Sequence, residues 1–85
     1  MTSQEFKEAS IREVYLVLEA SGIERGANSW PVMDKAINIF RQRSHSMAEF
    51  EFFMEVSTAY FESREPELEE FKIIRIGNEY KIVRR

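Results

Sequence analysis

The 85-residue chain has no cysteine, one histidine, three glycines and two prolines. Without cysteine it has no disulfide scaffold, no thiolate zinc site and no thiol nucleophile. A single histidine leaves no multi-histidine metal site. No apolar run approaches the roughly 18–20 residues of a membrane span, and the N-terminal segment has neither the basic start nor the apolar core of a signal peptide. These absences predict a soluble, cytoplasmic protein.

The chain is rich in aromatic residues. Its length suits one small globular domain over residues 1–85, and its 44% apolar content argues against disorder. A chain of this size buries only roughly 60–65% of the surface that its unfolded form exposes, so the core is thin. Eleven residues are aromatic, and five of these lie within twelve positions: Phe50, Phe52, Phe53, Tyr60 and Phe61.

Charge is distributed unevenly along the chain. The formal net charge of −3 conceals two opposed blocks. Residues 47–70 carry eight glutamates and one arginine, a net −7, and residues 71–85 carry five basic residues and one glutamate, a net +4. An acidic segment is therefore followed directly by a basic one.

The first predicted helix covers residues 3–21. Thr2 and Glu5 have the spacing of a capping box before it, and Gly22 is suited to end it in a left-handed conformation. Its apolar residues spread over more than half of the helix circumference. Such a wide arc predicts that this helix is the central one of the domain.

Two further helices are predicted over residues 30–43 and 46–64. Pro31 suits the first turn of the second helix, where its missing N–H costs nothing. Ser46 and Glu49 form another capping box, which opens the third helix. The third helix carries more apolar surface than one core contact requires.

After residue 70 the apolar period changes from 3.6 to 2, which predicts a β-hairpin over residues 71–84. Gly77-Asn78 suits a two-residue turn with glycine first. This register pairs Arg75 with Tyr80, Ile73 with Ile82 and Phe71 with Arg84. The expected inward residues are Phe71, Ile73, Tyr80 and Ile82. The predicted fold class is therefore α+β, with three helices packed around the first and a C-terminal antiparallel β-hairpin.

No pattern in the sequence indicates catalysis or metal binding. His45 lies between Ser44 and Ser46, but no orienting group or oxyanion site accompanies this trio. Glycine-rich phosphate loops and metal-binding motifs are absent. Glu51 and Glu55 lie one turn apart, as a solvated polar face requires. We therefore expect a protein that is not an enzyme and has neither a cofactor nor a metal.

The apolar excess on the third helix points to association with another protein. Phe52, Val56 and Ala59 form a second face beside the expected core face, and Tyr60 lies at the seam. The expected core face consists of Phe50, Phe53, Met54, Ser57 and Phe61. We interpret this second face as a partner-binding surface, because small monomers rarely expose large apolar patches. The predicted contact residues also include a glutamate ridge and the outer face of the hairpin: Glu51, Glu55, Glu62, Ile74, Ile76 and Val83.

The leading functional hypothesis is a small interaction module that acts as a regulator, adaptor or inhibitor of a larger protein. The partner is another protein or a second copy of the chain, and the glutamate ridge would steer a basic partner. A sharper version has the acidic ridge occupy the basic nucleic-acid site of a larger enzyme, as small phage-encoded inhibitors do. No membrane partner is expected.

The alternative is a nucleic-acid-binding domain. Three helices followed by a hairpin is the element order of a winged helix. The hairpin cations that would contact phosphates are Lys72, Arg75, Lys81, Arg84 and Arg85. Against this, the third helix would enter the major groove, and its glutamates would repel the nucleic-acid backbone.

Overall fold

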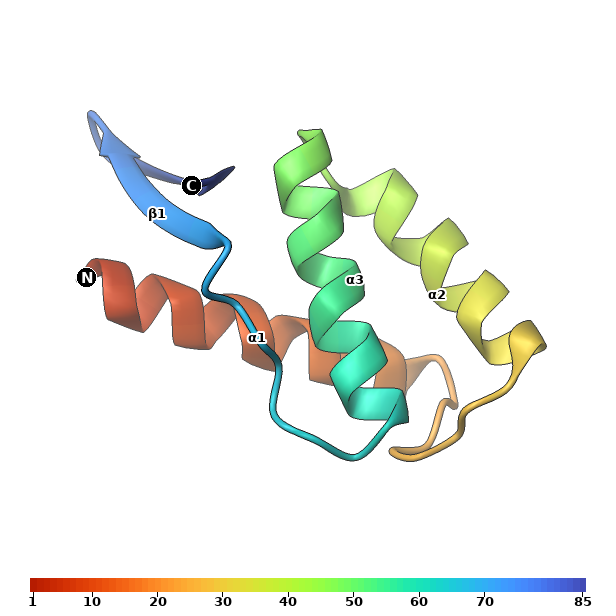
Figure 1. Ribbon diagram of the computed structural model, residues 1–85. Helices are drawn as coiled ribbons and strands as arrows, with labels where there is room; N and C mark the ends of the chain where they lie inside the picture. The colour runs from red at the N-terminus through yellow and green to blue at the C-terminus, as the bar shows by residue number, and fades with distance from the viewer.

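The computed structural model describes all residues 1–85 and shows the predicted α+β fold. The helices are α1 (Ser3–Ala20), α2 (Trp30–Arg43) and α3 (Met47–Phe61), and the strands are β1 (Phe71–Ile76) and β2 (Glu79–Arg84). In Figure 1, α3 stands between α2 on one side and the hairpin on the other, and α1 crosses beside it. None of the three helices has the length and apolarity needed to cross a lipid bilayer.

Local hydrogen bonds fix the helix starts. The capping box of α1 is confirmed, since the Thr2 hydroxyl accepts from the Glu5 N–H at 3.1 Å and the Glu5 carboxylate accepts from the Thr2 N–H at 3.0 Å. At α3 only half of the predicted box forms. The Ser46 hydroxyl accepts from the Glu49 N–H, but the Glu49 carboxylate accepts from the N–H of His45, one residue before the cap.

The third helix ends earlier than predicted, at Phe61 rather than at residue 62 or 64. Ser63 adopts a left-handed conformation, with φ of 54°. The Arg64 N–H then donates to the carbonyl of Ala59 at 2.9 Å, which closes the last turn. This reversal sends residues 62–70, the acidic linker, back along α3.

The prediction that α1 is central is wrong, because α3 holds that position. The third helix packs against α1, α2 and β2, whereas α1 buries only Ser10, Val14 and Leu18. Leu16, counted in the predicted apolar arc of α1, is 57% exposed. The buried residues of α3 are Phe52, Phe53, Val56, Ser57, Ala59, Tyr60 and Phe61.

One hydrophobic cluster of 13 residues joins every helix and strand. Aromatic pairs hold the layers together. Phe53 of α3 packs on Phe40 of α2, with ring centroids 5.4 Å apart, and Phe52 meets Phe71 of β1 edge-on at 5.6 Å. Such pairs add specific geometry to the area that they bury.

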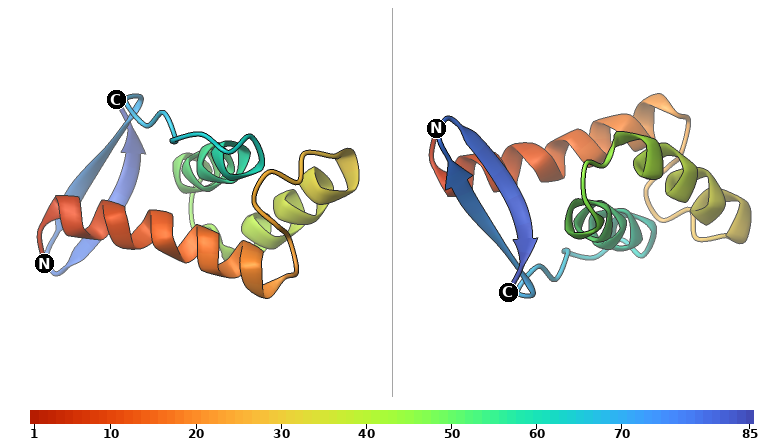
Figure 2. Two further views of the ribbon diagram at one scale, coloured as in Figure 1. Left: turned by 90° about the horizontal axis from the view of Figure 1, so that it is seen from below. Right: turned by 90° about the horizontal axis from the view of Figure 1, so that it is seen from above.

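The hairpin has the predicted register. Residue partners are Phe71 and Arg84, Ile73 and Ile82, and Arg75 and Tyr80. Gly77 has φ of 63°, as a glycine-first turn requires. The hairpin lies across the N-terminal half of α1, on the side away from α2 (Figure 2), where the Tyr80 ring stacks on Phe6 at 5.1 Å. Phe71 and Ile82 are buried on the inward face, as predicted.

Candidate partner-binding surface

The predicted second face of α3 is part of the core. Phe52 and Val56 are 0% exposed and Tyr60 is 3% exposed, and Ala59 beside them is also fully buried. The prediction that this face is open is wrong, because α1 and the hairpin cover it. Phe52, for example, lies under Phe71 of β1. These side chains cannot contact a partner while the protein stays folded.

Tyr60 instead anchors the loop between α1 and α2. Its hydroxyl donates to the carbonyl of Ile23 at 2.7 Å, and its ring packs on Tyr15 at 5.5 Å. Burial raises the pKa of Tyr60 above 10.0, Glu19 and Glu24 raise it further, and Arg25 opposes them. The phenol therefore keeps its proton and its hydrogen bond to a higher pH than an exposed tyrosine would.

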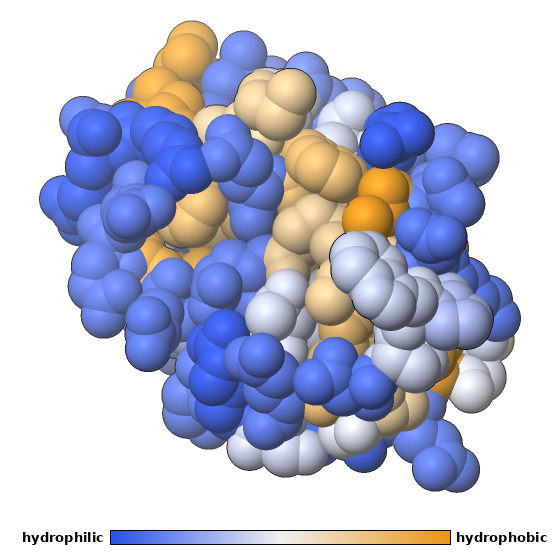
Figure 3. Space-filling model, turned by 45° about the vertical axis from the view of Figure 1, so that its right-hand side comes forward, coloured by the Kyte–Doolittle hydropathy of each residue, from blue (hydrophilic) through white to orange (hydrophobic).

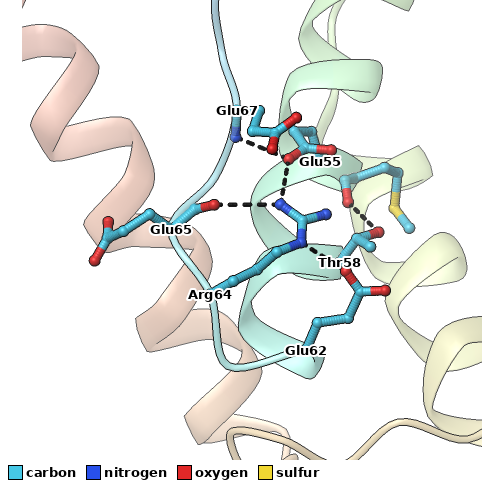
Figure 4. Close-up of polar contacts among 7 residues, drawn as sticks. Glu55, Thr58, Glu62, Arg64, Glu65 and Glu67 are labelled. Carbon is cyan, nitrogen blue, oxygen red and sulfur yellow. Dashed lines mark hydrogen bonds and ion pairs between the residues drawn. The ribbon is translucent and has the colours of Figure 1, made fainter.

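The glutamate ridge lies on the surface, where ion pairs tie it to the acidic linker. Arg64 pairs with Glu55 at 3.0 Å and with Glu62 at 2.6 Å, and donates to the carbonyl of Glu65 at 3.2 Å (Figure 4). Glu55 also accepts from the Glu67 N–H at 2.9 Å. The hydrogen bonds to Glu62 and Glu55 raise the pKa of Arg64 above its usual value. Arg64 thus holds the linker against α3.

A second arginine neutralises the other end of the ridge. Arg84 of β2 pairs with Glu51 and, at 2.5 Å, with Glu70. Its guanidinium carbon lies 5.1 Å from the centre of the Phe71 ring. The hydrogen bonds to Glu51 and Glu70 raise the pKa of Arg84. Arg84, one of the hairpin cations predicted to contact nucleic acid, therefore makes its ion pairs within the protein, at the surface.

A depression of about 320 Å³ opens between α3, the acidic linker and the hairpin. Phe50, Met54 and Phe71 supply its apolar lining. Four carboxylates line it as well and are called the acidic rim: Glu51, Glu55, Glu67 and Glu70. Arg84 is the only cation among the lining residues, so the depression has an excess of negative charge.

Apolar side chains of α2 and α3, two helices that pack against each other, continue from this depression, which Phe50 and Met54 line. Met47, Phe50 and Met54 recur at three- and four-residue spacing on α3, and Met33 and Ile37 lie one turn apart on α2. Met47 is 70% exposed, and the other four are half-buried. Figure 3 shows an apolar band between two hydrophilic flanks on this side of the molecule. We call these five residues the apolar strip.

The prediction for the two faces of α3 was only partly right, because the second face is buried and two residues of the expected core face are not. Phe50 and Met54 were predicted in the core with Phe53, Ser57 and Phe61. The latter three are buried, but Phe50 and Met54 are only half-buried. One sequence signal distinguishes Phe50 and Met54 from the three buried residues: they lie on the same side of the helix as Met47, next to the glutamate ridge. The exposed apolar surface of α3 is therefore narrower than predicted and lies elsewhere.

The apolar side chains on the outer face of the hairpin are exposed or half-buried, as the alternation along the two strands predicts. Ile76 is 55% exposed, and Ile74 and Val83 are half-buried. Lys72, Lys81 and Glu79 share this face with them, so it is a mixed surface rather than an apolar one. Partner binding by the three apolar residues stays a prediction.

The basic side chains of the hairpin differ in how far contacts within the protein already engage them. Lys72, Lys81 and Arg85 are exposed. Arg75 donates to the carbonyl of Gly77 at 2.9 Å and lies 5.9 Å from the centre of the Tyr80 ring. The helix that a winged helix presents to the major groove corresponds to α3, which the rest of the protein largely encloses. Only the element order of that fold is present.

The region around His45 is a helix junction. The Ser44 hydroxyl donates to the carbonyl of Phe40 at 2.5 Å, and the Ser46 hydroxyl accepts from the Glu49 N–H. Both serines therefore serve as helix caps. No three side chains of His, Cys, Asp or Glu are grouped in a way that could hold a metal ion.

No protein-family model matches the chain, and no curated protein or solved structure shows significant similarity to it.

Proposed function

We propose that the protein is a non-enzymatic interaction module that binds a basic region of another protein, as a regulator, adaptor or inhibitor. The observation that carries this proposal is the depression beside α3, which three apolar side chains and the acidic rim line together. Protein interfaces commonly combine an apolar centre with a polar border. The depression and the adjoining apolar strip offer both on one side of the molecule.

The charge on this side sets the chemistry of the partner. Seven glutamates belong to the ridge and the linker, against the two arginines Arg64 and Arg84. We call these glutamates the acidic surface: Glu51, Glu55, Glu62, Glu65, Glu67, Glu69 and Glu70. The remaining negative charge favours a basic partner and speeds its encounter at low salt. The basic nucleic-acid site of a larger enzyme is one surface of this kind.

The alternative, nucleic-acid binding through the hairpin, draws on fewer free cations than the sequence indicates. Arg84 is committed to two carboxylates, and Arg75 is held at the turn. Lys72, Lys81 and Arg85 remain as candidate phosphate contacts. A binding measurement with duplex DNA separates this alternative from the proposed function.

Capture of proteins from the native host tests the proposed function. The variant has Glu65→Gln, Glu67→Gln and Glu69→Gln, three exposed linker positions whose replacement leaves both arginine pairs intact. We expect the immobilised wild-type protein to retain basic proteins, and the variant to retain severalfold less. Salt at about 1 M, where the screening length is about 3 Å, should release them.

The matched control removes three carboxylates elsewhere, with Glu8→Gln, Glu13→Gln and Glu79→Gln. These residues are exposed on α1 and at the hairpin turn. The control should retain basic proteins as the wild type does. Equal losses in both variants would mean that only net charge matters. Retention that nuclease treatment abolishes would favour the nucleic-acid alternative.

A further inference from the structure

We propose that the segment bound is a basic amphipathic helix that lies along α3, with its apolar face on the apolar strip and a lysine or arginine side chain in the depression. This inference rests on the proposed function and specifies the form of the partner. Phe50 and Met54 belong to both the strip and the lining of the depression. One helix can therefore contact both surfaces at once.

The spacing of the strip matches a helical ligand. Met47, Phe50 and Met54 stand at relative positions 0, 3 and 7 on α3. A helix that binds an apolar surface presents its own anchors with the same helical period, so its apolar face can run alongside this row. The three methionines of the strip, Met33, Met47 and Met54, have flexible side chains that adapt to an incoming apolar face.

The helical backbone of α2 and α3 also favours a helical ligand over an extended one. The strip lies on two α-helices, whose backbone groups are paired internally. A strand seated there would leave its own N–H and C=O groups without partners on this side. A helix brings its backbone already hydrogen-bonded and needs only side-chain contacts.

The charges beside the strip orient the basic side of the ligand. The acidic rim lies on the linker side of α3. On the opposite flank, α2 exposes Asp34, Asn38 and Arg41, which have no net charge. The lysines and arginines of the bound helix should therefore face the linker.

Arg84 shows how the depression holds a guanidinium. It lies over the Phe71 ring and pairs with Glu51 and Glu70. Glu67 lines the same depression, and its carboxylate makes no hydrogen bond or ion pair within the protein. A ligand cation can rest its aliphatic stem on Met54 and bring its charge to Glu67.

A second copy of the chain fits this site poorly. The ligand needs a helix with a free apolar face and a basic side. The helix α2 carries Lys35, Arg41 and Arg43, but its apolar residues Ala36 and Phe40 are buried and Met33 and Ile37 are only half-buried, which is a narrower face than the ligand needs. The helices α1 and α3 both carry several glutamates. The ligand is therefore expected to come from a different protein.

The test uses three synthetic 18-residue peptides and nuclear magnetic resonance of the isotope-labelled protein. The first peptide has leucines along one helical face and lysines elsewhere. The second has the same composition in an order that separates no faces, and the third replaces every lysine with glutamate. We expect the first peptide to bind and to shift the signals of Met47, Phe50, Met54 and Ile37. The other two should bind at least tenfold more weakly.

Two exposed positions supply the variants. Met47→Ser and Glu67→Gln should each weaken the first peptide threefold to tenfold, about the effect of a contact worth up to 1.4 kcal/mol. Leu16→Ser and Glu8→Gln are the matched controls on α1, and both should leave the affinity unchanged. Signals recorded without peptide at several protein concentrations report self-association.

Each other outcome overturns the inference in a distinguishable way. Equal binding of the second peptide, with the same loss on Glu67→Gln, would agree with the proposed function. It would contradict the inference that the ligand is an amphipathic helix. Binding sensitive to Leu16→Ser rather than Met47→Ser would place the site elsewhere. Concentration-dependent shifts on the strip would identify a second copy as its occupant. Absence of binding by both basic peptides would contradict the inference and the proposed function together.

Discussion

Replacing Phe52 with alanine should lower the free energy of unfolding by about 3–5 kcal/mol. Its side chain is among the largest that the protein buries completely, and it packs on both Phe53 and Phe71. The substitution removes the burial energy of the ring and leaves a cavity that the neighbouring aromatic residues fill only in part. Small proteins are stable by only about 5–15 kcal/mol, so a large share of the stability would be lost.

Urea denaturation followed by circular dichroism measures this effect. Met47→Ala is the matched control on the same helix, because Met47 is largely exposed, and it should change stability by no more than about 0.5 kcal/mol. A loss below about 1 kcal/mol for Phe52→Ala would contradict the core position of Phe52. It would also restore the second face of α3 as a partner-binding surface.

Replacing Tyr60 with phenylalanine should lower the free energy of unfolding by about 1–3 kcal/mol. The substitution keeps the ring contact with Tyr15 but leaves the buried carbonyl of Ile23 without its donor. It should also change the dependence of stability on pH. The folded protein favours the neutral phenol, whose pKa lies above the ordinary 10.0 of the unfolded chain. The associated stability is therefore present below pH 10 and is lost as the pH rises through the folded pKa.

Unfolding measured at pH 7 and at a series of values above pH 10 tests both parts. Wild-type stability should fall more steeply above pH 10 than that of Tyr60→Phe. Tyr80→Phe is the control, because Tyr80 is only half-buried and bonds the carbonyl of Met1 near the surface. Identical alkaline profiles for the wild type and Tyr60→Phe would contradict the buried hydrogen bond.

The elements of the fold were predictable because their signals are local. The Thr2–Glu5 box, a pattern only four residues long, fixes the start of α1. Gly77 in a two-residue turn fixes the strand register. Each of these signals depends on hydrogen bonds and backbone angles between near neighbours. The end of α3 was less predictable, since Ser63 takes a conformation more usual for glycine or asparagine.

The buried face of α3 was not predictable from its own pattern. Apolar residues surround most of this helix, so periodicity alone does not say which of them other elements cover. The contacts that decide it link distant residues, as Tyr60 does with Ile23, 37 positions away. The pairing of Arg84 with Glu51, 33 positions away, likewise has no local signal. It converts a residue expected to contact nucleic acid into an internal partner of the acidic rim.

The most direct test of an acidic, protein-binding surface beside α3 compares Arg84→Gln with Arg85→Gln. Both remove one positive charge, but only the first frees carboxylates, those of Glu51 and Glu70. We expect Arg84→Gln to bind the basic amphipathic peptide more tightly than the wild type, and Arg85→Gln to change this affinity less. Neither variant should bind duplex DNA measurably. Weaker peptide binding by Arg84→Gln, or wild-type DNA binding that both substitutions reduce, would contradict such a surface.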